Sequence, residues 1–101
     1  MRKTTKQTVS AFINGEKRKV NNTESTGDTL LLFGKVIAWR ADGEIYCTLA
    51  GYGTPTTRER LNGLFYMLKR KRPFHQVNHE QMFDGEPIGT QEIIKVTGDW
   101  A

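Results

Sequence analysis

The clearest hydrophobic periodicity in the chain lies in residues 61–68. Apolar side chains there recur at i, i+3, i+4 and i+7, on one face of a helix: Leu61, Leu64, Phe65 and Leu68. Thr56 and Glu59 precede this stripe with the S/T-x-x-E spacing of a capping box, and Pro55 disfavours helix in the residue before it. The pattern predicts one amphipathic helix that begins near Thr56 and ends before Pro73.

Two strand-like runs, residues 9–13 and 16–20, lie on either side of Asn14-Gly15. Asn-Gly is a strong signal for a two-residue hairpin turn, because both central residues of that turn need a positive φ angle. The signal predicts a hairpin in which Phe12 lies opposite Lys17. The second run is charged on both faces, which is typical of an edge strand that lysines protect against further pairing.

The longest apolar stretch, residues 29–40, is separated from the run 45–50 by Asp42-Gly43. A two-residue turn there predicts that Trp39 pairs with Tyr46 across two antiparallel strands. Because these runs are the most apolar in the chain, we expect this hairpin to form the centre of the sheet.

Shorter signals complete the pattern. Gly34 indicates a bulge or bend within the apolar stretch, and residues 21–28 are expected to form a polar loop. Residues 74–83 have a strand-like pattern, Asp84-Gly85 predicts a third hairpin turn, and residues 91–96 predict a last short strand.

The chain has 101 residues, enough for one domain with a modest core. Residues 1–8 are polar and basic, and we expect them to form a flexible arm. Residues 9–101 are expected to form a single α+β domain, in which one amphipathic helix packs on a small, mainly antiparallel sheet of β-hairpins with five to seven short strands. Trp100, beside the C-terminus, is expected either to pack on this domain or to be exposed.

Positive charge is concentrated in two blocks. Residues 1–20 and residues 58–72 each carry six Lys or Arg and one Glu, whereas the whole chain has a net charge of only +4. Such a polarised surface favours an anionic partner through long-range attraction. The alternative is a solvated surface that keeps a small protein soluble.

Nucleic acid is the anionic partner that these blocks indicate, because aromatic residues that can stack on bases lie near the cations: Tyr52, Tyr66 and Phe74. No helix-turn-helix, zinc-finger or aromatic RNA-binding motif is present, so binding would be directed mostly at the backbone. The candidate contacts are Arg58, Arg60, Lys69, Arg70, Lys71 and Arg72, with Lys17, Arg18 and Lys19 as a second patch. Residues 69–72 also have a structural explanation, because cations stabilise a helix C-terminus.

A candidate anion site lies between a predicted strand and the predicted helix, at Gly51, Gly53, Thr56 and Thr57. Backbone amides there could face a phosphate at the positive end of the helix. A tight strand-to-helix connection would explain both glycines without a ligand.

Other chemistry has little support in the sequence. His75 and His79 are four residues apart with Glu80 adjacent, but a zinc site needs three or four ligands, so we expect surface histidines and no metal. Cys47, the single cysteine, excludes an internal disulfide and is expected to be a small core residue in a reducing compartment. Without a recognisable catalytic set, the sequence predicts neither an enzyme nor a cofactor.

No apolar run approaches the roughly 20 residues that span a bilayer, and no apolar segment follows the basic N-terminus as in a signal peptide. We therefore expect a soluble, cytoplasmic protein without membrane partners.

Three segments resemble short proteins encoded by tailed bacteriophages. They are LLLFGKVIA at residues 30–38, LAGYGTPTTRERLN at residues 49–62 and MFDGEPI at residues 82–88. The resemblance implies a phage origin and expression in the cytoplasm of a bacterial host. It implies no catalytic residues, and the basic run at residues 69–72 is not part of it.

Two functions follow as hypotheses. The first is a phage accessory protein that binds nucleic acid, DNA or RNA, largely through backbone electrostatics. The alternative is a non-enzymatic protein-interaction module that binds a host bacterial protein through an exposed sheet edge and inhibits or redirects it. A virion component is a third reading, and an unpaired edge strand would also permit a homodimer.

Overall fold

The computed structural model describes residues 1–97, so Trp100 lies outside the described residues. Over that range the chain forms two helices and nine strands. In chain order the elements are α1 (Lys3–Ile13), β1 (Lys17–Val20), β2 (Thr23–Thr26), β3 (Thr29–Leu32), β4 (Lys35–Ala41), β5 (Glu44–Cys47), α2 (Pro55–Lys69), β6 (Phe74–Val77), β7 (Glu80–Phe83), β8 (Glu86–Pro87) and β9 (Ile94–Lys95).

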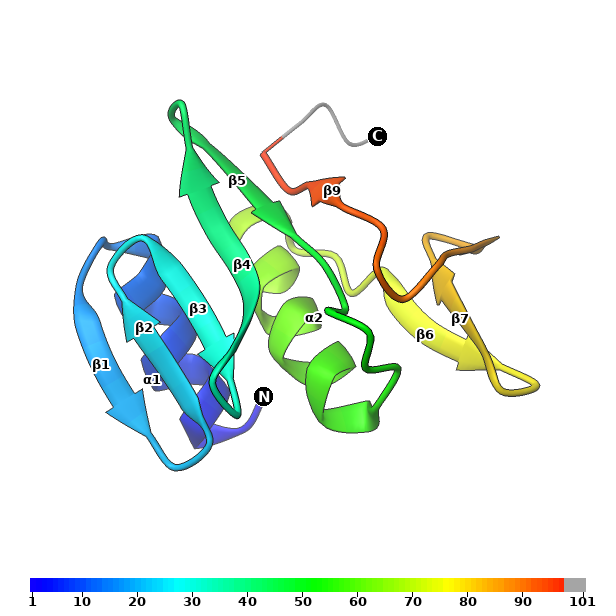
Figure 1. Ribbon diagram of the computed structural model, residues 1–101, viewed down its shortest axis with the longest axis horizontal. Helices are drawn as coiled ribbons and strands as arrows, with labels where there is room; N and C mark the ends of the chain where they lie inside the picture. Colours follow the sequence, from blue (N-terminus) through cyan, green and yellow to red (C-terminus); the bar gives the residue numbers. More distant parts are fainter. Residues whose placement is uncertain (98–101) are drawn as a thin grey trace.

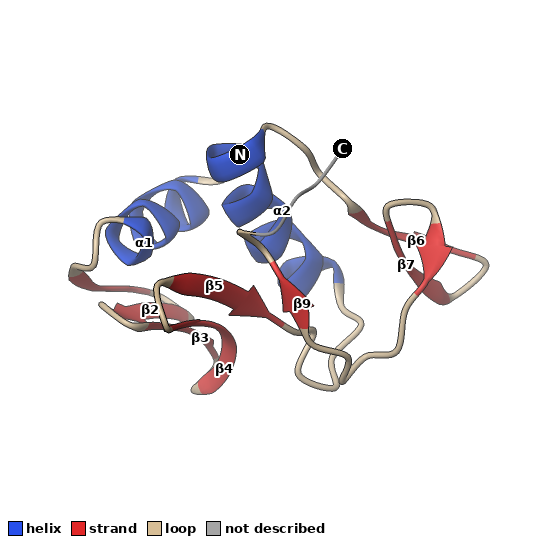
Figure 2. Cartoon of the chain, turned by 90° about the horizontal axis from the view of Figure 1, so that it is seen from above, coloured by secondary structure: helices blue, strands red, loops and turns tan. Residues whose placement is uncertain are grey.

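Six strands form one antiparallel sheet in the order β1-β2-β3-β4-β5-β9, and β6, β7 and β8 form a second, three-stranded sheet. Both helices lie on the same face of the larger sheet, and no described helix covers its other face (Figure 1, Figure 2). The predicted α+β fold with a mainly antiparallel sheet of hairpins is confirmed. The second helix, α1, was not predicted.

The N-terminal segment forms helix α1 instead of a flexible arm followed by a strand. Four of its residues are fully buried at helical spacing: Thr5, Thr8, Val9 and Phe12. Two threonines stand in this stripe where apolar residues would have revealed the helix. The prediction of a mobile arm at residues 1–8 is therefore corrected.

Asn14-Gly15 ends α1 and does not form a hairpin turn. The Gly15 amide donates to the Phe12 carbonyl at 3.1 Å, and the Glu16 amide donates to the Ala11 carbonyl at 2.7 Å. With Gly15 at φ +71°, these bonds form a Schellman motif, which needs the same positive φ as a hairpin turn. The predicted pairing of Phe12 with Lys17 is therefore wrong.

The expected polar loop at residues 21–28 contains strand β2. Thr23 and Ser25 point toward the helices and are buried. The Ser25 hydroxyl donates to the Glu16 carbonyl at 2.7 Å, so a hydrogen bond replaces apolar packing at this position. The edge-strand prediction for residues 17–19 is confirmed, but the partner of β1 is β2.

The central hairpin is confirmed: Trp39 pairs with Tyr46 across β4 and β5, and their rings stack with centroids 6.0 Å apart. Gly34 divides the apolar stretch into two strands, as predicted, through a tight turn and not a bulge. Phe33 and Gly34 both have positive φ, 51° and 79°, and form the two-residue turn between β3 and β4. Asp84-Gly85 forms the predicted third turn, between β7 and β8.

Helix α2 begins one residue earlier than predicted, at Pro55, with Thr54 as its N-cap. The Thr57 amide donates to Thr54 Oγ1 at 3.2 Å, so Thr54 caps the helix and the predicted capping box of Thr56 and Glu59 is wrong. Three residues of the predicted stripe are buried and a fourth packs against the core at its margin: Leu61, Leu64, Phe65 and Leu68. The helices approach so closely that a Cβ added at Gly63 would collide with Thr5 Cγ2.

Candidate nucleic-acid interface

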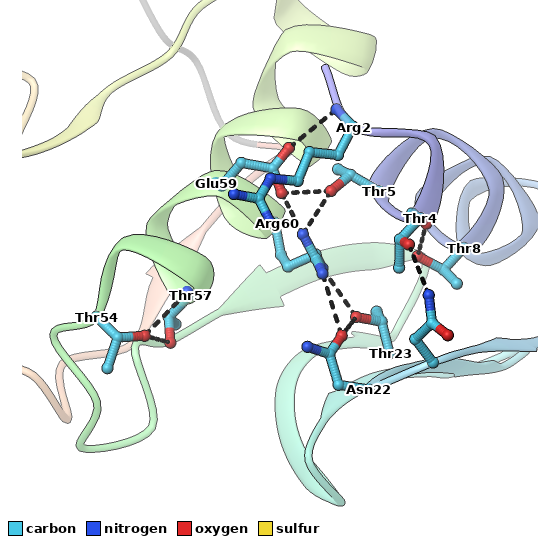
Figure 3. Close-up of polar contacts among 11 residues, drawn as sticks. Arg2, Thr4, Thr5, Thr8, Asn22, Thr23, Thr54, Thr57, Glu59 and Arg60 are labelled. Carbon is cyan, nitrogen blue, oxygen red and sulfur yellow. Dashed lines mark hydrogen bonds and ion pairs between the residues drawn. The ribbon is translucent and has the colours of Figure 1, made fainter.

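Arg60 is at the centre of a buried polar cluster between the helices and β2 (Figure 3). It is only 3 % exposed, and its Nε donates to Thr23 Oγ1 at 2.8 Å. Its terminal nitrogens donate to Thr5 Oγ1 at 2.9 Å and to Asn22 Oδ1 at 3.1 Å, and they form an ion pair with Glu59. Because all three nitrogens are engaged inside the protein, Arg60 does not belong to the predicted surface site.

Arg58 also has a structural role. Its Nη1 lies within hydrogen-bond distance of the Gly53 carbonyl at 3.0 Å, Gln76 Oε1 at 3.1 Å and Gln81 Oε1 at 2.9 Å. These contacts join the start of α2 to the hairpin of β6 and β7. The side chain is half-buried, so it retains some access to solvent.

A different group of cations comes together at the β1 end of the sheet. We call it the basic edge, and it consists of Lys3, Lys6, Lys17, Arg18 and Lys19. All five residues are exposed, and none forms an ion pair with another residue in the described part of the chain. Lys3 and Lys6 come from the segment expected to be a mobile arm, and the fold places them beside Arg18 of β1.

A groove of about 460 Å³ runs between α1 and β1 within the basic edge. Its charged lining consists of Lys3, Lys6 and Arg18 together with one carboxylate, Glu16. The first turn of α1 contains no acidic residue, so the positive end of the helix dipole adds to this potential. The groove is therefore a cationic surface of fixed shape.

Residues 69–72 do not form one basic surface on the helix. Lys69 is the last residue of α2, and Arg70 is its C-cap in the left-handed conformation, with φ 62°. The Arg72 guanidinium lies over the Tyr66 ring, 4.0 Å from its centroid. Arg72 also lines a second groove, of about 480 Å³, with Arg58, His75 and Glu59.

The chain itself provides partners for several groups of the candidate anion site. The Gly51 amide donates to the Thr90 carbonyl at 2.8 Å, and the Thr57 hydroxyl lies 2.8 Å from Thr54 Oγ1. A Cβ at Gly53 would lie 2.7 Å from Gln81 Cδ, so this glycine permits a close approach of the β6–β7 hairpin. These contacts favour the explanation that both glycines serve a tight strand-to-helix connection and do not bind a ligand.

The remaining chemical candidates are placed as follows. His75 lies in β6, and His79 lies in the two-residue turn that follows it, at φ 67°. Within residues 1–97 no three His, Cys, Asp or Glu side chains gather as a metal site would require. Cys47 is a fully buried core residue, as predicted, and burial raises the pKa of its thiol far above the ordinary value of 9.0.

Comparison with known families gives the chain a context. A family model described as Kyanoviridae Gp96 protein matches residues 1–100. The chain belongs to this family. It is a family of phage proteins, which confirms the phage origin that the resemblance implied. Neither the curated proteins nor the solved structures gave a match.

The two described helices were also considered as membrane-spanning segments. The longer of the two described helices, α2, has 15 residues, and neither is long and apolar enough to cross a bilayer.

Proposed function

We propose that this phage-encoded protein is a non-enzymatic accessory protein that binds nucleic acid in the cytoplasm of the host bacterium. The observation that carries the proposal is the basic edge. Five exposed cations without ion-pair partners in the described residues repel one another, and an anionic polymer would relieve that repulsion. The polymer with a regular array of negative charges in that cytoplasm is nucleic acid.

The geometry of the basic edge favours contacts with phosphates over contacts with base edges. Its cations come from the first turns of α1 and from one short strand, so they cover a broad ridge instead of a single projecting helix. Lysine and arginine contacts of this kind fix position on the backbone but carry little sequence information. Residues 69–72, of which Arg70 and Arg72 are exposed, provide a second, weaker set of phosphate contacts.

Two variants with matched charge test the proposal. The edge variant replaces Lys3, Lys6, Lys17 and Lys19 with glutamine, and the control variant replaces residues 69–72 with glutamine. Each loses four positive charges, so the two have the same net charge. Binding to labelled duplex DNA, single-stranded DNA and RNA is measured by fluorescence anisotropy at about 50 and 200 mM salt.

The edge variant is expected to lose most of its affinity and most of the salt dependence. The slope of log K against log[salt] falls by about 0.7–0.9 for each phosphate contact removed, so four lost contacts change it by about 3. The control variant is expected to lose less. Equal losses in both variants would mean that net charge alone drives binding, and no binding of the wild type at low salt would refute the proposal.

A second candidate function, docking on a host protein, has one observation in its favour. Phe33 is 74 % exposed at the tip of the β3–β4 hairpin, in a left-handed conformation that disfavours bulky residues. Val36 and Tyr52 are also exposed nearby, and Ile37 lines an apolar hollow of about 300 Å³ beside Phe33. Capture of the same host protein from nuclease-treated lysate by the wild type, but not by Phe33→Asn, would support this function over nucleic-acid binding.

A further inference from the structure

The face of the large sheet that no described helix covers begins at the basic edge. Strand alternation places Arg18 and Ser25 on the helix side, so their neighbours Lys17 and Thr26 lie on the open side. In the same way, buried Ala38 and Cys47 place the adjacent residues of β4 and β5 on the open side.

One row of cross-strand neighbours crosses this open face from β1 to β9. Lys17 pairs with Thr26, and the Thr26 hydroxyl lies 2.5 Å from the Thr29 hydroxyl. Thr29 pairs with Trp39, Trp39 with Tyr46, and Tyr46 with the lysine of β9. The members of this row are Lys17, Thr26, Thr29, Trp39, Tyr46 and Lys95.

The middle of the row is an aromatic platform. The rings of Trp39 and Tyr46 are half-buried and nearly parallel, with an interplanar angle of 19°. No described helix covers this face of the sheet (Figure 2). Because both residues are only half-buried, part of their surface remains accessible to solvent. Ring surfaces of this kind stack on unpaired bases with little regard to sequence, because every base has a π face.

Charge is distributed unequally along the row. Lys17 has no ion-pair partner in the described residues and is continuous with the rest of the basic edge. At the other end, Lys95 lies 3.7 Å from the Glu44 carboxylate, which lowers its attraction for phosphate. The row spans five strand-to-strand steps, about 24 Å. A strand of nucleic acid would therefore place phosphates at the β1 end and bases over the aromatic pair.

We infer that the preferred ligand is single-stranded nucleic acid, with bases stacked on Trp39 and Tyr46 and phosphates held by the basic edge. The inference rests on the proposed function and names the form of nucleic acid that the protein takes. A duplex offers its phosphates to the basic edge, but its bases already stack on each other and do not reach a flat sheet. The duplex therefore gains only the electrostatic part of the interaction.

The first test compares Trp39→Val with Phe33→Asn. Both remove an aromatic ring, but Phe33 lies in the turn between β3 and β4, outside the row. Asparagine tolerates the positive φ of position 33, and valine keeps the strand propensity of position 39. Binding to labelled oligo(dT), oligo(U) and duplex DNA, each of about 15 nucleotides, is measured after unfolding curves have confirmed that both variants fold.

We expect Trp39→Val to bind single strands about 5- to 100-fold more weakly and the duplex unchanged, because stacking is lost and the charges remain. Phe33→Asn should bind both forms like the wild type. The ratio of oligo(dT) to oligo(U) affinities shows whether DNA or RNA is the ligand. Unchanged single-strand affinity in Trp39→Val, or equal wild-type affinity for duplex and single strand, would overturn the inference while the proposed function stands.

A second measurement does not depend on the stability of the Trp39 variant. The sequence contains two tryptophans, so Trp100→Phe leaves Trp39 as the one remaining indole. Stacking predicts that saturating oligo(dT) quenches its fluorescence, whereas duplex bound to the basic edge does not. Binding of oligo(dT) without quenching would overturn the stacking model, and absence of binding to either ligand would refute the proposed function itself.

Discussion

Replacing Arg60 with alanine tests whether this side chain stabilises the fold or contributes to a nucleic-acid-binding surface. Arg60 is 3 % exposed, and it donates hydrogen bonds to the buried hydroxyls of Thr5 and Thr23. Alanine would leave those hydroxyls and the Glu59 carboxylate without their charged partner. A hydrogen bond to a charged group contributes about 1.5–3 kcal/mol, so losing the two bonds to buried hydroxyls costs about 3–6 kcal/mol. We expect Arg60→Ala to lose that much of the free energy of unfolding.

Thermal and urea unfolding followed by circular dichroism measure this loss. For a domain of this size about 1 kcal/mol corresponds to about 4–8 °C in Tm, so Tm should fall by about 12 °C or more. Arg58→Ala is the matched control: it makes the same chemical change in the same helix at a half-buried guanidinium, and we expect a loss of about 1 kcal/mol. If Arg60→Ala has the same Tm as the wild type but a lower affinity for nucleic acid, the conclusion that Arg60 stabilises the fold from a buried polar cluster would be refuted.

Three further substitutions have defined outcomes. Gly63→Ala should lower Tm despite the better helix propensity of alanine, and adding Thr5→Ser, which removes the colliding methyl, should restore it in a double-mutant cycle. Phe33→Asn should raise the free energy of unfolding by about 1 kcal/mol in urea titrations, because asparagine tolerates positive φ. The pKa of Glu44 lies below its ordinary value, mainly because the Thr97 hydroxyl donates to its carboxylate, so this bond stabilises the fold at neutral pH and is lost as acid protonates Glu44. Thr97→Val should therefore raise the Glu44 pKa in an NMR titration.

The strands joined by Asp-Gly turns were predictable because one dipeptide supplies the positive φ that a short hairpin needs. Asp42-Gly43 and Asp84-Gly85 show this. Asn14-Gly15 gave the same local signal at the end of a helix, where the same φ closes a Schellman motif. Phe33-Gly34 was missed as a turn because phenylalanine is a poor residue for that conformation.

Helix α1 and strand β2 were not predicted from the sequence, and the reason is the same for both. Their inward positions carry hydroxyls in place of apolar side chains, notably at Thr5, Thr23 and Ser25. Binary patterning treats such residues as solvent-facing, and only a buried donor from elsewhere makes them suitable for the interior. That donor, Arg60, lies four residues before Leu64 on the apolar stripe of α2, and this spacing was the signal available in the sequence.

The basic edge could be anticipated only in part. Residues 17–19 were predicted as a cationic edge strand, which is confirmed. Lys3 and Lys6 join them only because α1 folds back beside β1, and that depends on the helix that the pattern did not reveal.

The way α1 is attached also has a consequence for the order of folding. Strands β1 to β5 follow one another through short turns, so their pairing closes small loops. The side chains that bind α1 to α2 are 54 to 57 residues apart in the chain, as with Thr5 and Glu59 or Ser10 and Met67. Helix α1 also packs on β1 and β2, which follow it closely in the chain. Loop closure to α2 costs more entropy than closure of these short connections, so α1 should pack on β1 and β2 first and meet α2 in a later step. Since Lys3, Lys6 and Arg18 all belong to this early unit, the groove of the basic edge should form before the two helices meet.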